Sequence, residues 1–318
     1  MWRREQQSIL GPGRPTKGDI EPLNRIFTNA FTDRYRRDGM PGVRVPHLNP
    51  EVWRFALECA GKGAMVWRDR GGDIVAFNLV HHSGTEGWMG PLAVRPDRQG
   101  QGLGKQVVLA GVEWLKAHSV RTIGLETMPR TVENVGFYSR LGFLPGHLTV
   151  TLSRSPEDPA GIACTRLSRD GAGNAALAEC AALTEQVAPG VTFERELRMT
   201  TDLAMGDTTL YRRHGMLAAF ALWHAVPLAE GRPREEVRVL KLVARDLAAM
   251  LAVLEGVEAA AEEEGAGRVT VRCQSSYADA YGALVAAGWQ AHWTDLRMTL
   301  AGWAEQPVSG IVLSNWEI

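Results

Sequence analysis

The stretch VRPDRQGQGLGKQVV, from Val94 to Val108, places three glycines and two glutamines within six positions, between two apolar runs. Glycine loses more conformational freedom on folding than any other residue, and in a helix it costs about 1 kcal/mol relative to alanine. From Gly102 onward, apolar residues recur at helical spacing and leave charged residues on the remaining side. The stretch therefore predicts a buried strand, a glycine-rich turn and a helix that begins near Gly102.

This turn has the chemistry of a phosphate-binding site. The first N–H groups of a helix have no intrahelical partner and lie at the positive end of the helix dipole. A turn without side chains lets the backbone itself contact an anion. Two nucleotide motifs do not fit, because a P-loop needs glycine where Gln99 stands and a hydroxyl residue where Gln106 stands. A dinucleotide fingerprint, G-x-G-x-x-G, does not fit either, because the third glycine, Gly104, comes one residue too early.

The spacing that fits is Q-x-x-G-x-G, from Gln99 to Gly104, which the run LAVRP precedes. About thirty residues later comes ENVGFYSRLGF, from Glu133 to Phe143. Together these motifs resemble the GNAT superfamily of acyl-CoA N-acyltransferases, and the resemblance spans about Gly18 to Arg154. It implies a mixed α/β fold, with a mostly antiparallel sheet flanked by helices, and acetyl-CoA as cosubstrate.

The resemblance also implies which residues bind the cofactor. Backbone N–H groups of the turn would hold the pyrophosphate, and the preceding strand would pair with the pantetheine arm as an added strand does. An N–H of that strand would polarise the thioester carbonyl. The implied turn residues are Gln99, Gly100, Gln101, Gly102, Leu103, Gly104 and Lys105, the strand residues are Leu92, Ala93 and Val94, and the opposite wall is formed by Asn134, Phe137 and Tyr138.

Tyr138 stands where the family has its general acid, near the departing sulfur. When an amine attacks a thioester, the leaving thiolate gains from a proton delivered at the right moment. The alternative is a helix tyrosine that only packs on the sheet.

The base that takes the proton of the amine is less evident from the sequence. Glu126 ends the strand TIGLET and is the first candidate, against the alternative of a solvated carboxylate at a strand end. Glu86, the pair His81-His82 and the C-terminal carboxylate of Ile318 are the other candidates.

The same order of elements occurs twice along the chain. We expect an acetyltransferase domain over residues 1–153, a linker over 154–161 and a degenerate second domain of the same fold over 162–318. In the second domain the run VRVLKLVARDLAAM has no glycine turn, and Leu284 stands where Tyr138 stands in the first. These two losses predict one cofactor site per chain.

The last residues, SGIVLSNWEI over 309–318, have the β-branched start of a strand. The second half already has its closing strand at LRMTL, whereas the first half lacks one after LTVTLSR. We therefore expect the C-terminal strand at the domain interface, where it would complete the sheet of the first half. The alternative is a last strand of the second half alone.

Composition narrows the class of protein. A net charge of −1 with 22% charged residues argues against nucleic acid or an anionic membrane as partner. Four scattered cysteines, an N-terminal start without an apolar signal region and the absence of an 18-residue apolar run predict a cytoplasmic protein. The eight histidines show no metal-ligand spacing, so we expect no metal.

These expectations favour an acetyl-CoA-dependent N-acetyltransferase that acts on a primary amine of a small molecule or peptide by direct attack on the thioester. The alternative is a non-catalytic acyl-CoA sensor. A sensor has no need of the proton donor that Tyr138 would supply. The sequence leaves the acceptor, the acyl length and the oligomeric state open.

Overall fold

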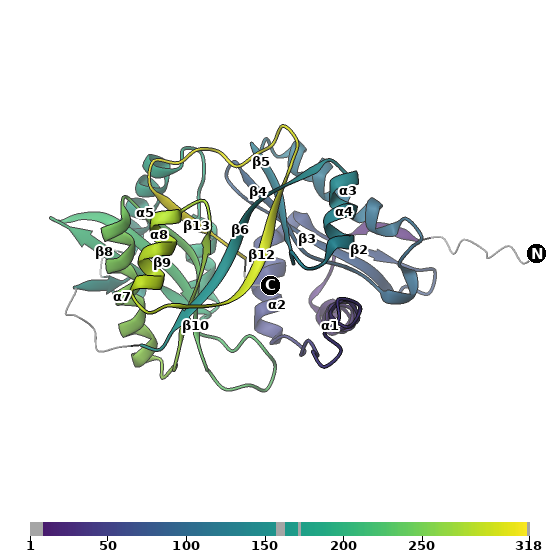
Figure 1. Ribbon diagram of the computed structural model, residues 1–318, viewed down its shortest axis with the longest axis horizontal. Helices are drawn as coiled ribbons and strands as arrows, with labels where there is room; N and C mark the ends of the chain where they lie inside the picture. The colour runs from purple at the N-terminus through teal and green to yellow at the C-terminus, as the bar shows by residue number, and fades with distance from the viewer. Residues whose placement is uncertain (1–8, 157–162, 171–172, 317–318) are drawn as a thin grey trace, which may run out of the picture.

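The computed structural model describes residues 9–156, 163–170 and 173–316. In the first half, α1 and α2 cover one face of the sheet and α3 and α4 cover the other (Figure 1). The elements of this half are β1 Leu10–Gly13, α1 Ile20–Arg37, α2 Pro50–Ala60, β2 Ala64–Arg68, β3 Ile74–Ser83, β4 Glu86–Val94, α3 Leu103–Ala117, β5 Thr122–Thr127, α4 Val132–Arg140 and β6 Phe143–Arg154.

The second half repeats this order of elements and adds one strand at the end. Helix α7 begins at its N-cap Asp246, whose side chain accepts a hydrogen bond from the Ala249 amide. Part of the expected linker over 154–161 lies outside the described residues. The elements are β7 Cys164–Arg166, α5 Gly173–Val187, α6 Glu194–Asp202, β8 Gly206–Arg213, β9 Met216–His224, β10 Val237–Ala244, α7 Leu247–Glu263, β11 Val269–Gln274, α8 Ala278–Ala286, β12 Gln290–Leu300 and β13 Ile311–Ser314.

The two halves share one mixed sheet instead of forming two separate ones. Its order is β1-β2-β3-β4-β5-β12-β6-β11-β10-β9-β8-β7, and β13 pairs with β10. In the described part of the chain the parallel pairs are β4 with β5 and β10 with β11, and the other pairs are antiparallel. Strand β12 lies between β5 and β6, and β6 continues onto β11, so both strands cross the middle of the molecule (Figure 1).

This arrangement corrects the expected closing strands. The strand that contains LRMTL does not close the second half, because it pairs with β5 and supplies the strand that the first half lacks. The C-terminal strand β13 pairs with β10 of the second half, as the alternative had it, and does not complete the sheet of the first half. It does lie at the interface, as expected, because Ser314 Oγ donates to Glu86 of β4. Pairing of β12 and β6 across the halves leaves neither long strand as an exposed edge, which would be open to aggregation.

The buried cores mix residues from both halves. Met298 of β12 is fully buried in the core beneath α3 and α4. Val150 and Leu152 of β6 belong to the core beneath α7 and α8, and Phe55 of α2 joins the core around α5 and α6. Among the described residues, none of the helices has the length and apolar character that crossing a bilayer requires.

Because β12 of the second half lies in the sheet of the first, we expect its buried Met298 to contribute to the stability of both halves. Met298→Ala removes a fully buried side chain, so we expect unfolding by urea to show a loss of about 2–5 kcal/mol in a single transition. The matched control is Met216→Ala, where the methionine is 68% exposed and its truncation should cost little. Equal losses in the two variants, or separate transitions for the two halves, would contradict a shared sheet.

Candidate functional site

The glycine turn adopts the strand–turn–helix geometry that the sequence predicts. Gly100 and Gly102 have φ values of +72° and +83°, a region that side chains rarely adopt, and a Cβ at either position would meet no atom within 4 Å. Gly102 is the N-cap of α3, and no side chain caps this helix. Gln99 braces the turn through an Nε2 hydrogen bond to the Val94 carbonyl at 2.9 Å. The first amides of α3 therefore have no side-chain acceptor, and the turn leaves open space in which an anion can bind.

Beside the turn, strand β4 separates from β5. The two strands pair only from Glu86 to Met89 on β4, and the register with β3 shifts between Met89 and Leu92. The residues beyond the separation, Leu92, Ala93 and Val94, line a cavity. Their strand edge is therefore available to an extended ligand.

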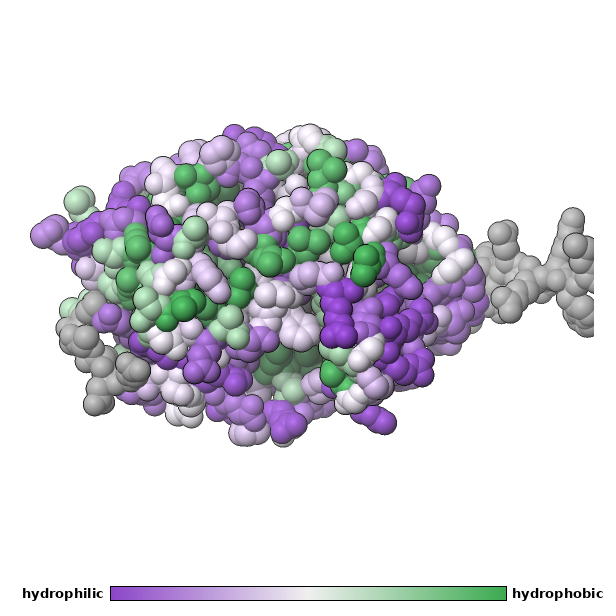
Figure 2. Space-filling model, viewed as in Figure 1, coloured by the Kyte–Doolittle hydropathy of each residue, from purple (hydrophilic) through white to green (hydrophobic). Residues whose placement is uncertain are grey.

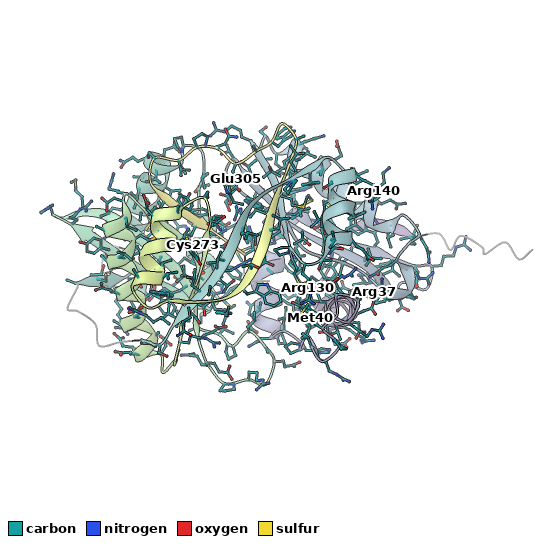
Figure 3. The ribbon with its side chains drawn as sticks, viewed as in Figure 1. Arg37, Met40, Arg130, Arg140, Cys273 and Glu305 are labelled. Carbon is teal, nitrogen blue, oxygen red and sulfur yellow. The ribbon has the colours of Figure 1, made fainter. Side chains whose placement is uncertain are left out.

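This cavity has a volume of about 1230 Å³ and takes its lining from both halves. Figure 2 shows that the face is hollowed between α1 and the loop after β9. Phe27, Phe31 and Leu228 supply an apolar wall, while Glu236 and Arg238 of the second half supply a charged one. Cationic side chains that line it from the first half include Lys105, Arg34, Arg37 and Arg140, of which Figure 3 labels the last two.

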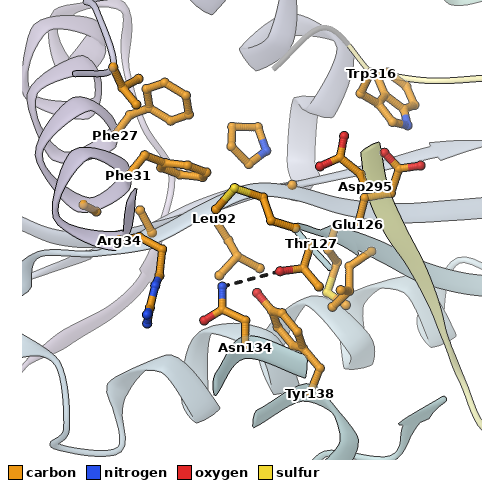
Figure 4. A pocket seen from close by; sticks show the side chains of 18 of the residues that line it. Phe27, Phe31, Arg34, Leu92, Glu126, Thr127, Asn134, Tyr138, Asp295 and Trp316 are labelled. Carbon is orange, nitrogen blue, oxygen red and sulfur yellow. Dashed lines mark hydrogen bonds between the residues drawn. The ribbon is translucent and has the colours of Figure 1, made fainter. Parts of the chain in front are cut away.

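Asn134, Phe137 and Tyr138 of α4 line the same cavity. Figure 4 shows Asn134 and Tyr138 on the α4 side of it, facing Leu92 of β4. Asn134 is held by a hydrogen bond of 3.4 Å from its Nδ2 to Thr127 Oγ1. Burial raises the pKa of Tyr138 to about 12, so its phenol keeps its proton at neutral pH. The geometry thus brings together all the cavity residues that the resemblance implied, except Gln101 and Leu103, which do not line it.

Glu126 also lines the cavity (Figure 4). Both of its oxygens accept hydrogen bonds. Oε1 accepts from Thr149 Oγ1 at 2.6 Å and from Arg297 at 3.1 Å, and Oε2 accepts from Arg272 at 2.7 Å. Burial alone raises the pKa of this carboxyl, yet the two guanidinium groups outweigh burial and hold the pKa below its ordinary value. Such a carboxylate is a weak proton acceptor.

A second carboxylate, Asp295 of β12, lies at the same place and was not expected from the sequence (Figure 4). Its Oδ2 accepts from Arg272 at 2.7 Å, and its Oδ1 accepts from the Trp293 indole at 3.3 Å. Burial raises its pKa, and the Arg272 guanidinium only partly offsets that rise. Arg272 in the largely apolar strand β11 is a sequence signal of a buried ion pair, whereas Arg297 lies in the more polar β12. Nothing local shows that either side chain faces the first half.

Of the other candidate bases, the described residues Glu86, His81 and His82 lie outside the cavity lining. Glu86 accepts a hydrogen bond from Ser314 Oγ. Burial, followed by the charge of Lys241, lowers the pKa of His81 to about 3, and burial also lowers the pKa of His82. Ile318 lies outside the described residues. Among the described side chains, no three His, Cys, Asp or Glu come together as metal ligands.

The second half lacks both devices that the first half has. The β10–α7 turn contains no glycine, and Asp246 Oδ1 occupies the Ala249 amide at 2.9 Å. Leu284 is fully buried in α8, where α4 carries Tyr138. A phosphate would meet a carboxylate at this helix terminus, and no phenol lies at the position equivalent to Tyr138.

Comparison with known proteins agrees with this geometry. Residues 25–143 match the model of the acetyltransferase (GNAT) family. A mycothiol acetyltransferase from Kytococcus sedentarius is 29% identical over 126 residues, which are 39% of this chain and 42% of that protein. The chain thus aligns with less than half the length of this curated relative.

Solved structures match over nearly the whole chain. A putative acetyltransferase from Pyrococcus horikoshii superposes with a TM-score of 0.69 at 16% identity, over 98% of this chain and 96% of that one. A tandem GNAT protein from the clavulanic acid biosynthesis pathway gives a TM-score of 0.60 at 14% identity, over 92% and 97% of the two chains. Residues 25–143 therefore match the acetyltransferase (GNAT) family, and the two halves together have the fold of the tandem GNAT protein.

Proposed function

We propose that this protein is an acetyl-CoA-dependent N-acetyltransferase with one catalytic site, built on its first half. The observation that carries the proposal is one cavity lined by the glycine turn, the open edge of β4 and the protonated phenol of Tyr138. The turn amides would bind the pyrophosphate, and Leu92 to Val94 would pair with the pantetheine arm. A sensor would need only the first two features, so the buried phenol favours an enzyme.

The transfer we propose is a direct attack. The amine nitrogen forms a bond to the thioester carbonyl carbon, and a backbone N–H of β4 stabilises the oxyanion. The carbon–sulfur bond then breaks, the Tyr138 phenol protonates the departing sulfur, and a carboxylate takes the proton lost by nitrogen. Asp295 suits that last role better than Glu126, because burial raises its pKa whereas two guanidinium groups lower that of Glu126.

The acceptor we propose is a primary amine of a small molecule or peptide. The name of the curated relatives concerns a match of 126 residues, whereas the lining of this cavity runs from Phe27 to Trp316. Similarity over one part of the chain does not show that the relative has the same cavity, because both halves of this chain line it. We therefore do not extend mycothiol chemistry to this protein.

Cofactor binding is tested by filling the turn. Gly102→Val puts a side chain at φ +83° into the open space before α3, so acetyl-CoA should no longer raise the melting temperature. Gly215→Val is the matched control, because Gly215 has φ +77° and open surroundings in the β8–β9 turn. We expect acetyl-CoA at 100 times its Kd to stabilise both the control and the native chain by about 2.7 kcal/mol. Stabilisation of both variants would place the cofactor elsewhere.

The general acid is tested with Tyr138→Phe. Loss of a positioned acid should lower kcat by roughly 10- to 10⁴-fold and leave the KM for acetyl-CoA nearly unchanged. Tyr211→Phe, which removes a hydroxyl outside the cavity lining, serves as control. An unchanged kcat when chemistry limits the rate would assign Tyr138 a packing role. Acetyl-CoA binding without turnover of any amine in the native chain would support the sensor instead.

The base is tested by the pH dependence of kcat in Asp295→Asn and Glu126→Gln. A carboxylate base works only when deprotonated, so kcat falls as the pH drops through its pKa. Because the pKa of Asp295 is raised, this fall should lie above the ordinary aspartate range, and it should vanish in Asp295→Asn together with roughly 10²- to 10⁴-fold of kcat. Glu126→Gln makes the same change of charge beside Arg272 and should keep the fall. The reverse pattern would make Glu126 the base.

A further inference from the structure

The second half retains the strand geometry of a cofactor cleft. The amide of Arg245 bonds to the Ala218 carbonyl just after β10, as that of Arg95 bonds to Val75 just after β4. Both strands shift register a few residues earlier, and β10 leaves β11 after Arg238. Leu242–Ala244 therefore occupies the place that Leu92–Val94 occupies in the first half.

In the second half this strand edge is already paired. Strand β13 runs antiparallel along β10, and Leu313 is fully buried. A Cβ on Gly310 would lie 2.4 Å from the Ala244 carbonyl oxygen. The C-terminal segment therefore already lies against the end of β10 at Gly310, directly before β13 begins. The paired residues are Lys241 with Ser314, Leu242 with Leu313, Val243 with Val312 and Ala244 with Ile311.

Asn315 closes the gap between the two separated strands. Its amide donates to the Leu240 carbonyl of β10 at 2.9 Å. Its side chain accepts from Gln274 Nε2 at 3.0 Å and donates to the Arg272 carbonyl at 3.0 Å, both on β11. The C-terminal segment thus bridges β10 and β11. It fills the opening that is equivalent to the one between β4 and β5, which in the first half leads to the cavity.

The end of this segment is clamped against the first half. The Trp316 ring stacks on His81 of β3 with centroids 4.0 Å apart, and Lys241 Nζ lies 3.8 Å from the ring centroid. Ser314 Oγ accepts from Lys241 Nζ at 3.0 Å and donates to Glu86 of β4. Ser314, Asn315 and Trp316 line the cavity that contains Glu126 and Asp295 (Figure 4).

We propose that β13 is a built-in occupant of the cleft of the second half, and that it fixes Trp316 as a wall of the acceptor site. Main-chain pairing of β13 takes up the edge that an extended pantetheine arm would need. The same pairing carries Trp316 between His81 and Lys241. The size of the amine that fits then depends on the C-terminal segment. The inference rests on the proposed function for the identity of the first-half ligand and for the reaction.

Occupancy is tested by hydrogen exchange on the full chain with and without coenzyme A. Amides of 241–244 should be protected in both conditions, whereas those of 92–105 should gain protection only when coenzyme A is added. Calorimetry should give one site per chain. Protection of 241–244 that appears only with coenzyme A, or a second site, would overturn the occupancy. Protection of 241–244 without any effect at 92–105 would support the occupant and count against the proposed cofactor site.

The wall is tested with Trp316→Ala, by comparing kcat/KM for benzylamine and methylamine. A larger acceptor site should raise the ratio of kcat/KM for benzylamine to that for methylamine at least tenfold and leave the KM for acetyl-CoA unchanged. In Trp316→Phe this rise in the ratio should be smaller. The control is Trp303→Ala, which removes an indole outside the cavity lining and should keep the native ratio. An unchanged ratio in Trp316→Ala would overturn its role. If the native chain turns over no amine, the proposed function fails and the exchange experiment alone decides the occupancy.

Discussion

The insertion of β12 between β5 and β6 is the constraint on which the rest of the structure depends. One strand of the second half completes the sheet of the first, and the register places Arg297 opposite Glu126 and Asp295 opposite Thr149. A one-residue slip would turn these side chains to the other face of the sheet. The position of β12 therefore determines the continuity of the sheet and also the charges that lie at the cavity.

That register brings charged side chains of both halves together beside the cavity. Arg272 donates to both Glu126 and Asp295, and Arg297 donates to both Glu126 and Glu305. Taking the largely buried members Glu126, Asp295, Arg272 and Arg297 out of water costs several kcal/mol each, and this cost is offset only when every partner is present. Glu305 is exposed. Opposite balances of burial and pairing then separate two neighbouring carboxylates, lowering the pKa of Glu126 and raising that of Asp295. One carboxylate holds the halves together, and the other retains the higher affinity for a proton.

The two halves use one architecture in different ways. In both, a bulged strand separates from its parallel neighbour. In the first half the opening leads to a glycine turn whose helix amides have no side-chain cap, and it remains a cavity. In the second half Asp246 caps the helix and β13 pairs with the open edge. Loss of the glycines in one half and occupation of its cleft are consistent with each other, since neither leaves room for a phosphate-bearing ligand.

Local signals in the sequence determined the turn, the helix that follows it, the position of Tyr138 and the repeated order of elements. Positive φ at Gly100 and Gly102 and helical periodicity act over a few residues, so they can be read from the chain itself. The pairing of β12, the seat of β13 and the approach of Arg272 and Asp295 to Glu126 were decided by tertiary structure alone. The pairing of strands that are far apart in sequence depends on register and burial in the folded sheet. The sequence of a strand that could pair with either of two neighbours does not show which one it pairs with.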